Sequence, residues 1–349
     1  MSMHVMELPR RVVVGTGIIS QVGEILKDLE LGSAAFVISG PNVKALLGRQ
    51  LETALEKSEF SSRWELIGPS TFQEVERVTQ LVRKSGASFL IGVGGGKSID
   101  IAKLASFDSK IPFVSIPTSA SHDGISSPFG SVKGMDRPYS LVAKPPMGIL
   151  ADISVISRAP SNLLISGCGD LISKKTAVRD WELAHEKKGE YFGGYSANLA
   201  MLSADLIMNN AKSIAAMETD SVRIVVEALI SSGVAAGIAG SSRPCSGSEH
   251  LFSHAMDIVA PGKGLHGEKC GIGAIMMARL HLMDQGEIRK SLETIGAPTR
   301  SLQIGASEGE IVKALVLART IRKERYTILD EAKLTESSAR ELARETKVV

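Results

Sequence analysis

Three successive glycines, Gly94-Gly95-Gly96, separate a short apolar run from a segment with helical spacing, and this stretch constrains the fold more than any other. The apolar run, residues 89–93, has the length of a buried strand, and apolar residues recur at helical spacing from Ile99 onward. Glycine lets backbone N–H groups approach an anion with no Cβ in the way, and a helix N-terminus adds about half a positive charge. The stretch therefore predicts a strand, a tight turn and a helix start that can hold a phosphate. A turn whose glycines only save space is the alternative.

This glycine turn matches neither of the two common nucleotide-binding fingerprints. The P-loop spacing ends correctly at residues 96–98 but requires a glycine where Ile91 stands. The Rossmann spacing fits Gly92 and Gly94 but meets Lys97 where its third glycine belongs. The turn by itself therefore leaves the bound nucleotide open.

Strand and helix signals alternate over the first part of the chain. The expected strands are residues 11–14, 34–38, 64–67, 89–93 and 112–116, and the expected helices are residues 18–31, 43–55, 72–84 and one beginning near residue 99. Such alternation predicts a doubly wound, Rossmann-like parallel sheet with right-handed crossovers and ligands at the carboxyl ends of its strands. Residues 126–156 are less regular, and we interpret them as hairpin or edge-strand material.

Beyond residue 158 the sequence has no convincing strand alternation and is expected to be helical. The predicted helices are residues 161–166, 170–185, 195–210, 214–218, 222–239, 247–259, 269–284, 286–295, 308–320 and 336–347. A chain of 349 residues is longer than one core usually organises. We therefore expect an α/β domain over residues 1–158 and an all-α domain over residues 159–349.

Composition excludes several classes of function. With 44% hydrophobic and 22% charged residues and a formal charge of +2, the chain has the composition of a globular protein that does not hold nucleic acid or an anionic membrane by bulk charge. Its three cysteines, Cys168, Cys245 and Cys270, are too few and too scattered for a disulfide framework, which favours a reducing cytoplasm. We also expect no export signal and no membrane span, because no apolar run is long enough.

Four polar groups in the helical part could carry chemistry. They are Asp170 in a Gly-Cys-Gly-Asp segment, His250 and His254, and His266 between glycines, which we expect in a loop. The spacing of His250 and His254 places both imidazoles on one helix face. A histidine pair of this kind is more often structural than metal-binding, but an aspartate with two histidines would leave open the coordination positions that a catalytic zinc requires.

Motifs in both parts of the sequence resemble one enzyme superfamily. They are Gly94-Gly95-Gly96 with Asp100 and Lys103, PTSASHDGISSP at residues 117–128, the aspartate of GCGD, and the HxxxH followed by a glycine-flanked histidine. Together they resemble the superfamily of iron-dependent alcohol dehydrogenase, glycerol dehydrogenase and dehydroquinate synthase. PTSASHDGISSPFGSV, GCGDLISKKTAVRDWELAHE and SSRPCSGSEHLFSHAMD look characteristic of its sn-glycerol-1-phosphate dehydrogenase branch, and the resemblance covers nearly the whole chain.

The resemblance implies a dinucleotide-binding domain followed by a metal- and substrate-binding domain, with the active site between them. It assigns the pyrophosphate to the glycine turn and the nicotinamide side to the segment that follows the next strand. The implied cofactor contacts are Gly94, Gly95, Gly96, Lys97, Ser98, Asp100, Thr118, Ser119 and Ser127. It implies that Asp170, His250 and His266 hold one zinc ion, and that Asp123 and His254 lie beside the substrate.

Cofactor choice is expected to be relaxed. NAD-specific relatives often place an acidic residue after the second strand, where it binds the ribose hydroxyls and repels a 2′-phosphate. Residues 39–42 read Ser-Gly-Pro-Asn and contain no carboxylate. We therefore expect NADP to be accepted as well as NAD.

The implied reaction is the reversible reduction of dihydroxyacetone phosphate to sn-glycerol 1-phosphate for archaeal membrane lipids. Zinc would polarise the ketone, and His254 or Asp123 would deliver the proton. Arg243 and then Lys263 are candidates for the substrate phosphate, although a solvated loop charge is as good an interpretation of either. A homo-oligomer is also expected.

Three other functions fit parts of the sequence. One is a glycerol or polyol dehydrogenase of the same superfamily, which needs no phosphate pocket. The second is a dehydroquinate synthase-like cyclase, which uses NAD transiently and eliminates phosphate. The third is a non-catalytic nucleotide sensor, which the retention of all three candidate ligands disfavours.

Overall fold

The computed structural model describes residues 4–132 and 139–349. The chain forms two compact units, Met1–Ala159 and Pro160–Val349. The first unit carries the sheet and the second is helical, so the expected α/β fold followed by an all-α part is confirmed.

The first unit is built on a six-stranded parallel sheet in the order β1-β8-β5-β4-β2-β3. The strands are β1 (Arg11–Gly15), β2 (Ala34–Ser39), β3 (Ser61–Leu66), β4 (Phe89–Gly94), β5 (Phe113–Pro117) and β8 (Gly148–Asp152). Every residue of β4, β5 and β8 is buried, whereas most residues of the edge strand β3 are exposed. The inner strands are short, nearly continuous apolar runs because both faces of a parallel sheet are covered.

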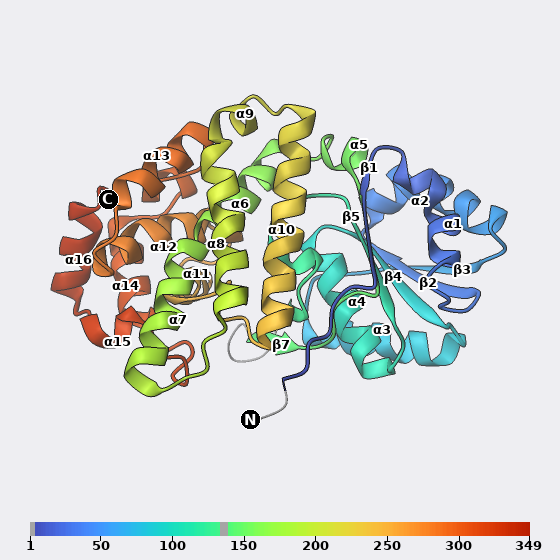
Figure 1. Cartoon of the computed structure of the whole chain (residues 1–349), viewed down its shortest axis with the longest axis horizontal. Coiled ribbons are helices and arrows are strands. Elements are labelled where there is room, and N and C mark those ends of the chain that lie inside the picture. Colours follow the sequence, from blue (N-terminus) through green and yellow to red (C-terminus); the bar gives the residue numbers. More distant parts are fainter. Residues whose placement is uncertain (1–3, 133–138) are drawn as a thin grey trace. The chain divides into compact units, whose positions relative to one another are not determined.

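Helices cover both faces of this sheet (Figure 1). They are η1 (Ile18–Gln21), α1 (Val22–Lys27), α2 (Pro41–Lys57), α3 (Phe72–Ser85), α4 (Gly96–Ser109), η2 (Asp123–Ile125) and α5 (Ile153–Ile156). The chain moves from β2 outward to β3 and then returns past β2 to β4, so right-handed crossovers place α2 on one face and α3 and α4 on the other. An apolar core joins η1, α1 and α2 to their face of the sheet.

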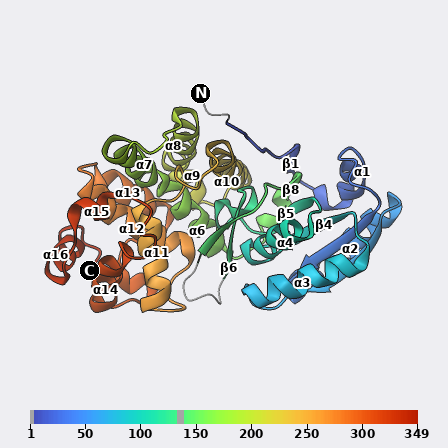
Figure 2. The same ribbon diagram turned by 90° about the horizontal axis from the view of Figure 1, so that it is seen from below.

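The interpretation of residues 126–156 was partly wrong. Strands β6 (Phe129–Val132) and β7 (Tyr139–Val142) pair antiparallel, as in the expected hairpin, and β6 contacts α4 (Figure 2); residues 133–138 between them lie outside the described residues. Residues 148–152, however, form β8, an inner strand between β1 and β5 and not edge material. A single short apolar run gives no sequence signal for its neighbours, and only the crossover topology inserts it there.

A buried lysine fastens the loop after β5 to α4. Lys103, in the middle of α4, is fully buried, and its Nζ donates to the carbonyls of Gly124, at 2.8 Å, and Phe129, at 2.6 Å. The same ammonium lies 3.3 Å from Oδ1 of the buried Asp100, one helical turn earlier. Burial lowers the pKa of Lys103, and the Asp100 carboxylate opposes that effect. The Asp100–Lys103 pair therefore fixes the segment that carries Asp123.

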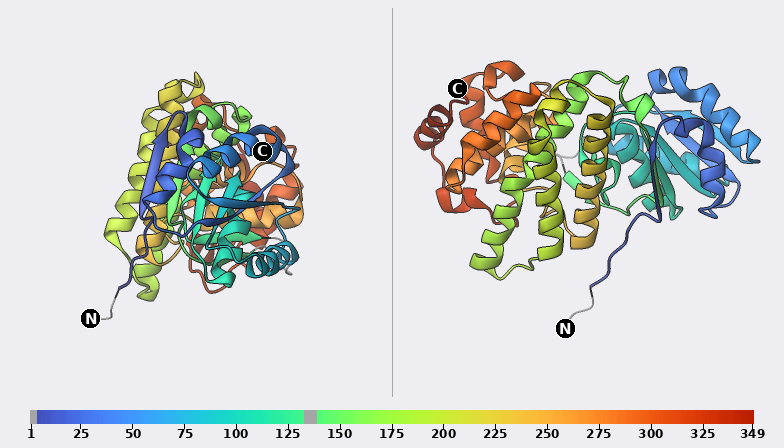
Figure 3. Two further views of the ribbon diagram at one scale, coloured as in Figure 1. Left: turned by 90° about the vertical axis from the view of Figure 1, so that its right-hand side faces the viewer. Right: turned by 45° about the horizontal axis from the view of Figure 1, so that its top comes forward.

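The second unit is made of helices only, within the residues that the structure describes. They are α6 (Ser161–Ile172), α7 (Lys174–Lys188), α8 (Gly194–Asn209), α9 (Ala211–Ala215), α10 (Thr219–Ala239), α11 (Ser248–Val259), α12 (His266–Leu280), α13 (Gln285–Ile295), η3 (Ser301–Ile304), α14 (Glu308–Ala318), α15 (Ile328–Ala332) and α16 (Glu336–Glu345). Helices α8 and α10 lie side by side (Figure 3), and α11 and α12 contact each other, while α6 contacts α12.

Two boundaries differ from the sequence prediction in ways that affect the candidate site. The helix predicted over residues 161–166 extends to Ile172. Asp170 therefore lies in the last turn of α6 and not at the start of the next helix. His266 is the first residue of α12 and not part of a loop, because the Glu268 carboxylate caps that helix by accepting the Leu265 N–H at 2.7 Å. Helix-terminal positions are the least predictable from sequence, since short-range capping contacts set them.

Helix α10 is, among the described residues, the one helix long and apolar enough to cross a membrane, but 72% of its most apolar window is buried within the protein. A buried apolar helix of this kind is typical of the core of a globular unit.

Replacing Lys103 with methionine tests the role of this lysine in the first unit. The methionine preserves the volume but leaves Asp100 buried without its cation, and breaking a buried ion pair in this way costs about 3–5 kcal/mol. We expect the free energy of unfolding in urea to fall by that amount. Lys84→Met removes an exposed lysine from α3 and should leave unfolding unchanged. An unchanged midpoint for Lys103→Met would contradict the assigned role.

Candidate functional site

The glycine turn lies where the topology of the first unit provides a binding position. β2 and β4 are neighbours in the sheet, with Ser39 opposite Val93, and the connections that leave their carboxyl ends run in opposite directions. This is the topological switch point at which open α/β sheets bind their ligands. Two helices begin there, α2 after Gly40 and α4 after Gly95. Their N-termini direct unpaired backbone N–H groups and partial positive charge at the same place.

Close packing requires the glycines of this turn. Gly94 has a φ of 144°, a conformation that side chains rarely adopt, and a Cβ on Gly96 would lie 1.8 Å from Nε2 of His122. A Cβ on Gly95 would lie 3.1 Å from the Ser119 hydroxyl, which is tighter than most Cβ contacts and would require that hydroxyl to shift. The space that His122 occupies is therefore enough to explain Gly96. Gly95 is the N-cap residue of α4, and no side chain caps that helix.

The other predicted cofactor residues fall into exposed and buried groups. Lys97 is exposed at the start of α4, and Ser98 is buried behind Gly94. The Thr118 N–H donates to the Gly94 carbonyl at 3.0 Å, so the segment after β5 lies beside the turn. Asp100 faces Lys103 and acts through it to position the loop.

Asp123 and Ser127 lie in that loop. The Ser127 N–H donates to the Asp123 carbonyl at 3.2 Å, and the Ser127 hydroxyl donates to the Phe129 carbonyl at 3.3 Å. Asp123 begins η2 and its side chain is half-buried.

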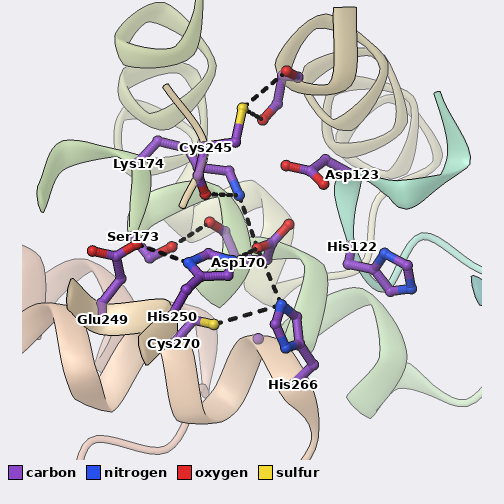
Figure 4. Close-up of polar contacts among 12 residues, drawn as sticks. His122, Asp123, Asp170, Ser173, Lys174, Cys245, Glu249, His250, His266 and Cys270 are labelled. Atoms are coloured by element: carbon purple, nitrogen blue, oxygen red, sulfur yellow. Dashed lines mark hydrogen bonds and ion pairs between the residues drawn. The ribbon is translucent and has the colours of Figure 1, made fainter. Parts of the chain in front are cut away.

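In the second unit, four side chains with metal-ligating atoms meet. One donor atom from each of Asp170, His250, His266 and Cys270 lies within 4.8 Å of the others, and this group could hold a metal ion. Figure 4 shows the four side chains turned toward one another. Nε2 of His250 is 3.3 Å and Nε2 of His266 is 3.8 Å from Asp170 Oδ1. The histidines come from α11 and α12 and the aspartate from α6.

Each of the two histidines is oriented by a partner at Nδ1, while its Nε2 faces Asp170. Nδ1 of His250 lies 2.8 Å from Oε1 of Glu249, and Nδ1 of His266 lies 3.4 Å from the Ser253 hydroxyl. Glu249 is itself buried and accepts hydrogen bonds from the Thr176 hydroxyl at 2.9 Å and the Gly247 N–H at 2.7 Å. A hydrogen bond at Nδ1 leaves the Nε2 lone pair for a metal, which is how metal-binding histidines are usually held.

The electrostatics of this group favour a cation. Burial raises the pKa of the Asp170 carboxyl, but the Lys174 ammonium, 2.8 Å away, and the two histidines outweigh burial and hold the pKa well below its usual range. Burial lowers the pKa of His250, but Cys270, Asp170 and Glu249 outweigh it and hold the pKa well above its usual value. The anionic groups thus draw positive charge onto His250, at the place where a metal would replace the proton.

His254 lies beside this group but is oriented differently. Its ring centroid is 6.2 Å from that of His266, and its buried Nδ1 has no hydrogen-bond partner among the described residues. Burial and the neighbouring His250 lower the pKa of His254 to about 4. The imidazole is therefore neutral near pH 7 and can pass on a proton only by taking up another.

The two candidates for the substrate phosphate have other roles in the structure. Arg243 is buried and forms a two-point ion pair with Glu190, with Nε 2.7 Å from Oε1, and its Nη1 donates to the Tyr326 carbonyl at 2.8 Å. Lys263 pairs with both carboxylate oxygens of Glu310, at 2.7 and 2.8 Å. Each cation already has a carboxylate partner, so we do not propose either as a phosphate ligand.

Sequence reasoning missed Lys174, Glu249 and Cys270. Cys270 follows His266 by four residues and shares a face of α12 with it, whereas Lys174, four residues after Asp170, is the first residue of α7. Glu249 immediately precedes His250. The four-residue spacing of Lys174 and Cys270 from predicted ligands was visible in the sequence, but the burial of the two side chains was not.

Comparisons with known proteins agree on the family. The family described as iron-containing alcohol dehydrogenase matches residues 13–160. The chain is 51% identical over 349 residues to the glycerol-1-phosphate dehydrogenase, NAD(P)+, of Nitrosopumilus maritimus, covering 100% of this chain and 98% of the relative. It is 46% identical to the enzyme of the same name from Thermococcus sibiricus, covering 100% and 99% of the two chains.

Solved structures extend the likeness of fold to more distant enzymes. Glycerol dehydrogenase from Schizosaccharomyces pombe aligns with a TM-score of 0.81 at 21% identity, covering 99% of this chain and 91% of that chain. Maleylacetate reductase from Agrobacterium tumefaciens aligns with a TM-score of 0.78 at 14% identity, covering 99% and 98%. These likenesses concern the fold, because one fold hosts several chemistries. The full-length identities decide the family: the chain belongs to the glycerol-1-phosphate dehydrogenase family of the iron-containing alcohol dehydrogenases.

Proposed function

We propose that the protein reduces dihydroxyacetone phosphate reversibly to sn-glycerol 1-phosphate with NADH or NADPH and zinc, in the cytoplasm, for archaeal-type membrane phospholipids. The observation that carries the proposal is the meeting of Asp170, His250 and His266, with both histidines held at Nδ1. The full-length relatives, named glycerol-1-phosphate dehydrogenase, support the choice of substrate.

The donor set fits a divalent cation. Asp170 offers a carboxylate oxygen, and His250 and His266 offer imidazole nitrogens whose other ring atoms are hydrogen-bonded or in contact with a hydroxyl. Two histidines and one carboxylate suit zinc or ferrous iron. We choose zinc, the ion that the resemblance implies; polarising the ketone is the chemistry that such an ion would supply when bound.

The glycine turn is the proposed pyrophosphate position, with Gly95, Gly96 and Lys97 supplying backbone N–H groups at the start of α4. Thr118, Ser119, Asp123 and Ser127 are proposed for the nicotinamide side. The loop after β2 contains no carboxylate, which supports use of NADP as well as NAD.

Two residues are proposed to manage the proton. His254 is neutral, and we propose that it delivers the proton to the product oxygen through water. Asp123 is the alternative donor. Because His254 starts the cycle uncharged, it adds no positive charge beside His266 before hydride transfer.

A coupled assay with dihydroxyacetone phosphate tests the proposed function most broadly. We expect NADPH oxidation and a product that an enantiomer-specific enzyme identifies as sn-glycerol 1-phosphate. Turnover of glycerol with no turnover of the phosphorylated ketone would favour a polyol dehydrogenase. Release of inorganic phosphate without net change in NADH would favour a cyclase.

Metal binding should strengthen as pH rises. A proton held by His250 must leave before a metal binds, while Asp170 stays ionised because its pKa is low. We expect the zinc dissociation constant to fall between about pH 6 and about pH 8, by up to about tenfold per pH unit for one displaced proton. Titration with a competing chelator measures it. A constant independent of pH would remove His250 from the ligand set.

Glu249→Gln tests the support behind His250. The variant keeps the shape of the side chain but removes the charge that orients the imidazole, and loss of such a partner typically weakens metal binding about 10–100-fold. We expect zinc affinity and turnover to fall together, while Glu341→Gln, a change on the exposed face of α16, alters neither. Full zinc affinity in Glu249→Gln would show that His250 does not bind the metal through Nε2.

A further inference from the structure

Cys270 is the fourth member of the metal-ligating group, and neither the proposed ligand set nor the proposed reaction uses it. It lies on α12 one turn after His266, and its side chain is completely buried. Its Sγ is 3.6 Å from Nε2 of His266, and its donor atom lies within 4.8 Å of those of Asp170 and His250. Figure 4 shows the sulfur directed at the same space as the two imidazoles.

Two of the distances between these donor atoms match those of a tetrahedral centre, and all four donor atoms lie within 4.8 Å of one another. Zinc binds nitrogen and oxygen at about 2.0–2.1 Å and sulfur at about 2.3 Å, so tetrahedral neighbours lie about 3.3 Å apart for nitrogen and oxygen and about 3.6 Å apart for nitrogen and sulfur. The separation of His250 Nε2 from Asp170 Oδ1 is 3.3 Å, and that of His266 Nε2 from Cys270 Sγ is 3.6 Å. The separation of His266 Nε2 from Asp170 Oδ1, 3.8 Å, is somewhat longer.

We propose that Cys270 is a fourth protein ligand of the metal, bound through its thiolate sulfur alongside Asp170, His250 and His266. The inference rests on the proposed zinc-dependent function and adds a ligand to its site. Binding forms one metal–sulfur bond, breaks the S–H bond, and releases that proton to solvent; no electron is exchanged.

The charges around the cluster accommodate this second anion. Lys174 is fully buried, with its Nζ 2.8 Å from Asp170 Oδ1 and 3.0 Å from the Cys245 carbonyl. A divalent metal with one carboxylate and one thiolate is neutral, and the buried Glu249 carboxylate beside His250 then balances the charge of Lys174. Without the thiolate, the same group would hold one uncompensated positive charge, which is more costly to bury.

A thiolate ligand also has a consequence for metal choice. Soft sulfur donors favour zinc over hard cations such as magnesium, whereas a site of two histidines and one carboxylate does not separate zinc from ferrous iron. A thiolate does not prevent catalysis, because zinc can expand from four to five ligands. Cys270 is therefore inferred to favour a thiolate-binding transition metal such as zinc over magnesium.

The other two cysteines provide controls within the same chain. Cys168 is equally buried, on α6, and burial raises the pKa of its thiol to about 12. Cys245 donates its S–H to the Ser232 carbonyl at 3.0 Å. Neither belongs to the metal-ligating group, so Cys168→Ala is a matched control for Cys270→Ala.

Replacing zinc with Co²⁺ tests the sulfur ligand directly, because a thiolate bound to Co²⁺ gives an intense charge-transfer absorption in the near ultraviolet. We expect this band in the wild-type protein and in Cys168→Ala. We expect Cys270→Ser to bind Co²⁺ and show the visible bands of the ion without the near-ultraviolet band. Wild-type protein that binds Co²⁺ with no such band would overturn the inference and leave the metal-dependent function intact.

Zinc affinity gives a second measurement that does not depend on turnover. We expect Cys270→Ser and Cys270→Ala to raise the zinc dissociation constant at least about tenfold, the lower end of what losing even an outer partner of a ligand costs. Cys168→Ala should match the wild type. Equal affinity in all four proteins would overturn the inference. Failure of the folded wild-type chain to bind either Co²⁺ or zinc would instead defeat the metal-dependent function.

Discussion

The buried carboxylate of Asp170 is the interaction on which the helical unit depends. An isolated buried carboxylate would be strongly unfavourable, and here Lys174, His250 and His266 supply the compensating groups from α7, α11 and α12. Four helices are thus tied together at one carboxylate oxygen, Asp170 Oδ1. The same contacts that make burial of Asp170 tolerable bring together the donors that can bind a cation. Stability and the proposed chemistry consequently share their residues.

The sheet unit also contains a buried lysine–aspartate pair, but that pair has another role. Lys103 is as buried as Lys174, but it donates mainly to backbone carbonyls, and its carboxylate partner Asp100 lies on the same helix. That lysine fixes a loop, whereas Lys174 adjusts the charge of a site. Because each lysine follows its aspartate at helical spacing, the two pairs look alike in the sequence. Their different roles follow from what surrounds them.

Local patterns predicted much of the fold. The apolar run before Gly94 and the helical spacing after it identified β4 and α4, because glycine, strand length and periodicity act over few residues. β8 was misread because its place between β1 and β5 depends on topology. Arg243 was a candidate because it lies shortly before His250 and a guanidinium suits a phosphate, and its pairing with Glu190, 53 residues away in sequence, could not be predicted. The roles of Lys174 and Glu249 could not be predicted either, because a charged residue beside a motif is usually exposed to solvent. Both side chains are in fact buried.

The central claim is that one metal ion bound by Asp170, His250 and His266 serves the reduction of dihydroxyacetone phosphate. Anomalous diffraction at the zinc absorption edge, from crystals of active protein grown with zinc and dihydroxyacetone phosphate, tests it most directly. The account predicts one strong peak in contact with Asp170 Oδ1 and with Nε2 of His250 and His266. A peak bound by other residues, or no peak from protein that remains fully active, would contradict it.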